Sequence, residues 1–282
     1  MWYEKRFRNR SVIPGFDLSF GLTITILSLI VVIPLCSLVL FSAQLTVKEF
    51  WDAVTAPRIL ASYAVSLKTA FIAAAINAVM GLILAWTIVR YDFPGKRLID
   101  GAIELPFALP TAVAGISLTY MTTNNGLVGS FFHRYFDVDI AYTPLGIVVA
   151  LIFIGIPFVV RTVQPVLEKI DIQYEEAAFL LGANRWKIFT TVVLPELVPA
   201  LLSGFSLAFA RGLGEYGSVV FISGNIPYKT EIAPLMIMAQ LQEYDYASAT
   251  SIALVMLFFA FVILSVNAYV QARTAKRVNA NA

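Results

Sequence analysis

Six long apolar stretches, separated by more polar segments, organise the chain. Each holds about 20 residues, enough for a helix to cross the hydrocarbon core of a bilayer. This pattern predicts an all-α, polytopic membrane protein with six transmembrane helices. The stretches run roughly over Leu18–Leu40, Tyr63–Val89, Leu105–Met121, Thr143–Val160, Val198–Ser223 and Ser251–Val270.

Basic residues predict the orientation of these spans. Most Lys and Arg residues fall at the termini and in the loops after the second and fourth spans, so both termini are expected on the cytoplasmic side. The first span is too long for a signal peptide and lacks a small-residue cleavage site, so it should be retained. The inner set is Lys5, Arg6, Arg8, Arg10, Arg90, Lys96, Arg97, Arg161, Lys169, Arg185, Lys187, Arg273, Lys276 and Arg277, and the outer set is Lys48, Arg58, Arg134 and Lys229.

The chain therefore divides into three parts. Residues 1–17 form a cytoplasmic N-terminal segment, residues 18–272 form the transmembrane domain, and residues 273–282 form a cytoplasmic tail. A cytoplasmic loop over about 161–195 interrupts the transmembrane domain.

Composition supports a membrane location and excludes several classes of function. Hydrophobic residues make up 59% of the chain and charged residues only 13%, about half the share of a soluble domain. The net charge of +2 and the absence of a basic stripe argue against nucleic-acid binding. A single cysteine, Cys36, and a single histidine, His133, leave little material for a metal site or an intramembrane enzyme, and no cofactor is expected in this chain.

The loop between the fourth and fifth spans is long for a compact membrane protein and carries helical signals. Glu175 and Glu176 lie in the first turn of a short helix, where the helix dipole favours acidic groups. Gly182 can adopt the left-handed conformation that closes such a helix. Arg185–Val193 predicts a second helix, and Pro195 suits the first turn of the next one. This helix–Gly182–helix segment could bind a partner protein or could lie on the lipid headgroups.

The fifth span contains two charged residues and several glycines. Arg211 and Glu215 are four residues apart, on one helical face, where they could form a salt bridge or flank a passage for an anion. The small residues of the third, fourth and fifth spans allow close helix packing or could expose backbone N–H groups to a polar passage. Glu104 is expected to cap the start of the third span.

Four segments carry a resemblance to a known family. Glu176-Ala177-Ala178, then Gly182, then Val192-Val193-Leu194-Pro195 resembles the Glu-Ala-Ala loop of ABC importer permeases, with Val192 where that pattern usually has Ile. The segments from Pro106 to Gly115, from Ile156 to Val166 and from Arg211 to Gly217 are similar to sulfate/thiosulfate permeases of the T-subunit type. The similarity extends over nearly the whole chain from about Pro14.

This resemblance implies a type I ABC importer permease (MetI-like) fold in a bacterial-type inner membrane. It also implies a sister permease of the W type, two copies of an ATP-binding subunit and a periplasmic sulfate- or thiosulfate-binding protein. The ATPase must be a separate chain, because Gly95-Lys96 is followed by Arg97 and no phosphate-binding loop occurs. A molybdate or tungstate permease is the nearest alternative, and a secondary anion transporter or a channel is a more distant one.

Two sets of residues are expected to carry the function: the first follows from the resemblance, and the second follows from the charged residues and glycines of the fifth span. The set expected to couple to the ATPase is Glu175, Glu176, Ala177, Ala178, Gly182, Leu194 and Pro195. The set expected to line the translocation pathway is Arg211, Gly214, Glu215 and Gly217.

Overall fold

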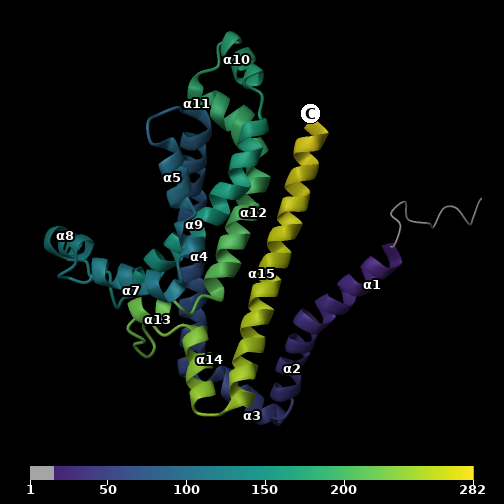
Figure 1. Ribbon diagram of the computed structural model, residues 1–282, viewed down its shortest axis with the longest axis vertical. Helices are drawn as coiled ribbons and strands as arrows, with labels where there is room; N and C mark the ends of the chain where they lie inside the picture. Colours follow the sequence, from purple (N-terminus) through teal and green to yellow (C-terminus); the bar gives the residue numbers. More distant parts are fainter. Residues whose placement is uncertain (1–15, 282) are drawn as a thin grey trace, which may run out of the picture.

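The computed structural model describes residues 16–281, and every regular element within that range is helical (Figure 1). The N-terminal segment expected over 1–17 lies almost entirely outside the described residues. In chain order the elements are α1 (Phe16–Leu27), the π-helix η1 (Ser28–Val32), α2 (Ile33–Ser42), α3 (Val47–Thr55), α4 (Pro57–Arg90), α5 (Lys96–Ile103), α6 (Leu105–Ala108), α7 (Thr111–Thr122), α8 (Leu127–Phe136), α9 (Pro144–Lys169), α10 (Ile172–Leu180), α11 (Arg185–Ile188), the π-helix η2 (Phe189–Val193), α12 (Leu194–Leu213), α13 (Val219–Ile222), α14 (Ala233–Gln242) and α15 (Tyr246–Asn281).

Within the described range, five helices are long and apolar enough to cross a membrane. They overlap the first, second, fourth, fifth and sixth predicted spans, and the existence of these five spans is confirmed. Their limits are Leu18–Ser42, Pro57–Arg90, Pro144–Lys169, Arg185–Leu213 and Tyr246–Arg273.

The third predicted span, Leu105–Met121, is not one helix. It consists of the short α6 and the longer α7, separated at Leu109 and Pro110. Pro110 has no N–H to donate to the preceding turn, and its ring forces the residue before it into an extended conformation. Leu109 accordingly has φ −88° and ψ 135°.

The fifth span begins earlier and ends earlier than the predicted Val198–Ser223. The helix starts in the loop between the fourth and fifth spans and runs through α11 and η2 into α12, which ends at Leu213. Continuation would require the Ser218 N–H to donate to the Gly214 carbonyl. It donates instead to Glu215 Oε1 at 2.9 Å, so this side chain replaces the next helical turn.

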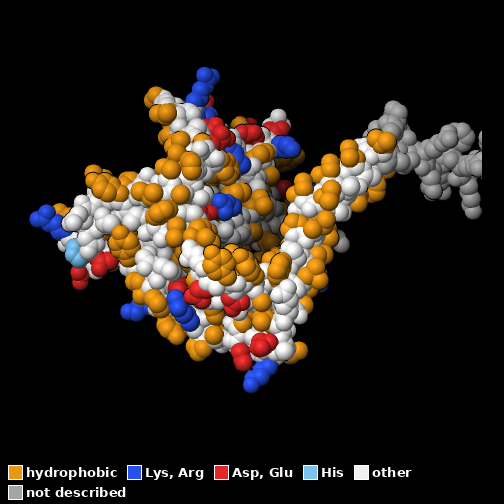
Figure 2. All heavy atoms as spheres, turned by 60° about the horizontal axis from the view of Figure 1, so that its bottom comes forward, with side chains coloured by type: hydrophobic (Ala, Val, Ile, Leu, Met, Phe, Trp, Pro, Cys, Tyr) orange, Lys and Arg blue, Asp and Glu red, His pale blue; other side chains and the backbone are white. Residues whose placement is uncertain are grey.

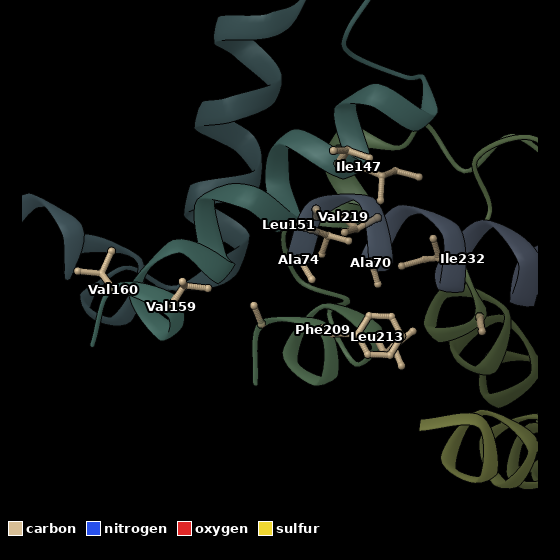
Figure 3. Close-up of a cluster of buried hydrophobic side chains, with 14 of the residues drawn as sticks. Ala70, Ala74, Ile147, Leu151, Val159, Val160, Phe209, Leu213, Val219 and Ile232 are labelled. Carbon is tan, nitrogen blue, oxygen red and sulfur yellow. The ribbon is translucent and has the colours of Figure 1, made fainter. Parts of the chain in front are cut away.

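Helices α4, α9 and α12 form the centre of the bundle. Figure 3 shows Ala70 and Ala74 of α4 facing Leu151 of α9, with Phe209 and Leu213 of α12 close by. These side chains are all buried.

Glycines let the central helices approach closely. A Cβ atom at Gly81 would lie 2.6 Å from Val159 Cγ1, and one at Gly204 would lie 2.5 Å from Thr162 Oγ1. Gly155 packs in the same way against Asn77. The packing interpretation of the small residues is therefore confirmed in the fourth and fifth spans.

Polar contacts hold the end of the bundle opposite α10. Arg58, at the start of α4, binds both carboxylate oxygens of the buried Glu231, with nitrogen–oxygen distances of 2.6 and 2.8 Å. Ser66 of the same helix accepts a hydrogen bond from the Ala233 N–H, which begins α14. These contacts fix α14 against α4.

The first span stands apart from this bundle. In Figure 1, α1 leans away from α15, and only the α2 end approaches it. Ser42 Oγ lies 2.8 Å from Ser251 Oγ at this junction. Figure 2 shows apolar side chains along the arm formed by α1 and α2, and no residue of Leu18–Ser42 is charged. This surface suits lipid or another transmembrane helix.

Candidate functional site

The loop between the fourth and fifth spans folds into an elbow with two helical arms, at the end of the bundle opposite α14 (Figure 1). Its first arm, α10, begins after Asp171, whose side chain accepts a hydrogen bond from the Gln173 N–H at 3.0 Å. Glu175 lies in the first turn, as predicted, whereas Glu176 lies beyond it, contrary to the prediction. Local capping thus defines where this arm starts.

Gly182 closes the first arm in the left-handed conformation, with φ +85°. The Gly182 N–H donates to the Phe179 carbonyl, and the Ala183 N–H donates to the Ala178 carbonyl. This pair of bonds is the Schellman arrangement that ends many helices. The predicted role of Gly182 in helix closure is confirmed.

The second arm begins at once and leads directly into the membrane. Asn184 caps α11 by accepting from the Lys187 N–H at 2.8 Å. The arm continues through η2 into α12, with Leu194 and Pro195 half-buried in its first turn. The second predicted helix is present, although its latter half has π-helical geometry.

The tip of the elbow exposes large apolar side chains. Leu180 and Leu181 are 86% and 88% exposed, and Phe179 and Trp186 are also mostly exposed. Exposing such a cluster of apolar side chains to water is unfavourable, and a contiguous exposed apolar patch commonly marks a binding surface. The elbow therefore presents a surface suited to a partner.

The Glu-Ala-Ala segment divides between this surface and the bundle. Glu176 and Ala177 are exposed, whereas Ala178 is half-buried. Glu175 points toward α4 and forms an ion pair with Arg90, its Oε1 lying 2.5 Å from Nη2. Only part of the motif is free to meet another protein.

A second polar cluster lies where α12 ends, part-way along the bundle (Figure 1). Arg211 Nη1 lies 2.7 Å from Glu215 Oε2, so the predicted salt bridge is present. The Ser218 backbone and hydroxyl donate to the other carboxylate oxygen at 2.9 and 3.0 Å. The Glu215 side chain is only 2% exposed, whereas that of Arg211 is 37% exposed. The carboxylate is enclosed and the guanidinium remains accessible.

The interruptions in the third and fifth spans meet at this cluster. A Cβ atom at Gly217 would collide with the side chain of Thr111, and one at Gly115 would collide with the backbone of Ser218. Gly214 has no atom within 4 Å of its Cβ position. Non-helical backbone at this depth is tolerated where it is buried in protein or lines a polar cavity.

A third cluster, which the sequence did not predict, joins α9 to α5 and to the start of the third predicted span. Arg161 of α9 binds Asp100 of α5 at 2.7 Å and Glu104 at 2.8 Å. Glu104 makes no capping hydrogen bond, contrary to expectation, because its carboxylate is directed to Arg161. Arg161 and Asp100 are 61 residues apart in sequence, so no local pattern could have paired them.

Comparison with known proteins gives one family and several full-length relatives. The family model described as "Binding-protein-dependent transport system inner membrane component" matches residues 55–277. The sulfate transport system permease protein CysT of Escherichia coli (strain K12) is 49% identical over 271 residues, which cover 96% of this chain and 97% of that protein. The protein of the same name from Synechocystis sp. is 42% identical over 261 residues, covering 93% and 91%.

Solved structures share the fold at low sequence identity. A bacterial ABC transporter that imports the acidic polysaccharide alginate has a chain with a TM-score of 0.75 and 16% identity, covering 92% of this chain and 96% of that one. A chain of the MetNI methionine ABC transporter has a TM-score of 0.59 and 15% identity, covering 82% and 99%. The architecture described above is thus the one found in these transporters.

Proposed function

Because the chain belongs to the family of inner membrane components of binding-protein-dependent transport systems, we propose that it is the T-type permease subunit of an ATP-driven sulfate/thiosulfate importer. Relatives named sulfate permeases match nearly the whole chain, which favours this substrate class. A molybdate or tungstate permease of the same superfamily is the alternative.

In this proposal the chain supplies half of the transmembrane pathway. A W-type sister permease supplies the other half, two ATP-binding subunits dock on the cytoplasmic side, and a periplasmic protein delivers the anion. One solved relative is an alginate transporter in complex with a substrate-bound periplasmic protein, which supports such an arrangement. Both termini then lie in the cytoplasm, as the distribution of basic residues favours.

The exposed apolar surface of the elbow is the observation that carries the proposal. Phe179, Leu180, Leu181 and Trp186 are exposed on arms fixed by caps. Docking of an ATP-binding subunit would bury this surface, with Glu176 and Ala177 at the contact. ATP-driven closure of that partner would move the elbow and change which side of the membrane the pathway faces.

The Arg211 cluster is the proposed anion contact within the pathway. The accessible guanidinium can donate charge-assisted hydrogen bonds to a sulfate oxyanion. Glu215 orients Arg211 and reduces its net charge, so the anion is held loosely enough to be released. Gly214 leaves the adjacent backbone open, and Gly217 allows the start of α7 to approach.

Uptake of labelled sulfate by cells tests the proposal. A strain lacking this chain should lose uptake, and expression of the chain together with its transporter partners should restore it. Excess thiosulfate should compete and excess molybdate should not; the reverse would favour the molybdate alternative. Uptake that continues without an ATP-binding subunit, and failure of such a subunit to co-purify, would refute the ABC permease assignment.

A further inference from the structure

The cytoplasmic end of α4 lies in the angle of the elbow and contacts both arms. Arg90, the last residue of α4, pairs with Glu175 of the first arm. One turn earlier, Trp86 packs edge-on against Phe189 of η2, with ring centroids 5.4 Å apart. These contacts bridge segments that are 85 residues or more apart in sequence.

The two contacts are joined to each other. The Arg90 guanidinium lies over the Trp86 ring, 5.6 Å from its centroid, and Phe189 continues the cluster outward to the exposed Trp186 at 5.9 Å. The Arg90 side chain is 14% exposed and that of Glu175 is 24% exposed, so the ion pair is partly shielded from water. The attraction between the two charges is therefore screened less by water and salt than in a fully exposed ion pair.

Helix α4 connects its junction with the elbow to the opposite end of the bundle. The helix continues to Pro57 at the opposite end of the bundle, where Arg58 binds Glu231. Along the way it packs against α9 and α12. A displacement of the elbow is thus delivered to the central helix as well as to α12, which the elbow joins directly.

We propose that Arg90 is a positioning residue, which couples the elbow to α4 through its ion pair with Glu175 and its stacking on Trp86. Without this connection the elbow can move on α12 while α4 stays in place. This inference rests on the proposed ATP-driven transport and adds a second route by which force reaches the bundle.

The test uses the complete transporter with its binding protein in proteoliposomes, where sulfate transport and ATP hydrolysis are measured together. For Arg90→Ala we expect ATP hydrolysis to persist while the amount of sulfate transported per ATP falls about tenfold, because one charge-assisted hydrogen bond is lost. Arg97→Ala is the matched control, because Arg97 is a nearby exposed arginine that forms no ion pair among the described residues. Its ratio should equal that of the unaltered protein.

Charge exchange separates coupling from folding. Arg90→Glu combined with Glu175→Arg should recover the part of the ratio that depends on the ion pair, although not the part that depends on stacking over Trp86, whereas either change alone should lower the ratio. If Arg90→Ala fails to assemble, Glu175→Gln, on the surface elbow, gives the same measurement. An unchanged ratio in the single variants, or no recovery in the exchanged pair, overturns the inference; absence of ATPase co-purification in the unaltered protein would instead overturn the proposed function.

Discussion

Gly182 provides the sharpest test of the elbow. Its φ of +85° is left-handed, and no atom lies within 4 Å of its Cβ position. A side chain at this position would therefore meet no obstacle, and the cost of substitution is backbone strain alone. For a residue with a Cβ this strain is about 1–2 kcal/mol.

This strain energy is large enough to shift the elbow away from its closed conformation. Since 1.4 kcal/mol corresponds to tenfold, Gly182→Ala should shift the equilibrium between closed and open elbow by about 5- to 30-fold. Gly182→Val should be worse, because branched residues tolerate positive φ least, and Gly182→Asn should be mildest. We expect sulfate transport per ATP to fall in the same order.

Reconstituted transporter provides the assay, with transport and hydrolysis measured on the same vesicles. Gly95 supplies a matched control: it has φ +86° and open space around its Cβ position, but precedes α5 instead of closing the elbow. Gly95→Ala carries the same strain and should leave the ratio unchanged. Equal ratios in Gly182→Val and the unaltered protein, or an equal defect in Gly95→Ala, would refute the reasoning.

Further experiments test the Arg211 cluster, the tip of the elbow and the start of α3. Arg211→Ala should lower sulfate uptake about tenfold or more by removing a charge-assisted contact, and Glu215→Gln should lower it less, while the complex still co-purifies with its ATPase; unchanged uptake would exclude a pathway role. Leu181→Ser should weaken ATPase retention during purification, since it removes apolar area from the exposed elbow, and full retention would count against docking there. Thr46 and Glu49 form a capping box at the start of α3, in which the Thr46 N–H donates to the Glu49 carboxylate and the Glu49 N–H donates to the Thr46 hydroxyl. These bonds lower the pKa of Glu49 below its ordinary 4.5, so the capping box stabilises α3 above pH 4.5, and this contribution is lost as the pH falls through the lowered pKa. Thermal unfolding in detergent should show this loss, and Glu49→Gln should reduce it.

Local signals in the sequence were sufficient for much of the elbow. A glycine at the required spacing closes α10, and one of the two predicted acidic residues, Glu175, lies in its first turn, because helix ends depend on residues only a few positions apart. The apolar spans were predictable for a related reason, since crossing a bilayer depends on the composition of about 20 consecutive residues.

The third and fifth spans show where this reasoning stopped. The apolar stretch of the third predicted span continues through Pro110. The helix is nevertheless interrupted there, because Pro110 has no N–H to donate and restricts the conformation of Leu109. The end of α12 depends on the Glu215 carboxylate accepting from Ser218, an alternative to helix that span length alone does not reveal.

The membrane class, five of the spans, the closure of the elbow at Gly182 and the shared helical face of Arg211 and Glu215 could all be read from residues close together in the chain. The pairing of Arg90 with Glu175, the contacts of Arg161 with Asp100 and Glu104, and the packing of the broken third span against the end of α12 became visible only in the folded chain. The physical reason is that these contacts join helices distant in sequence. Their partners are set by how the helices pack, and each charge alone would be compatible with several others.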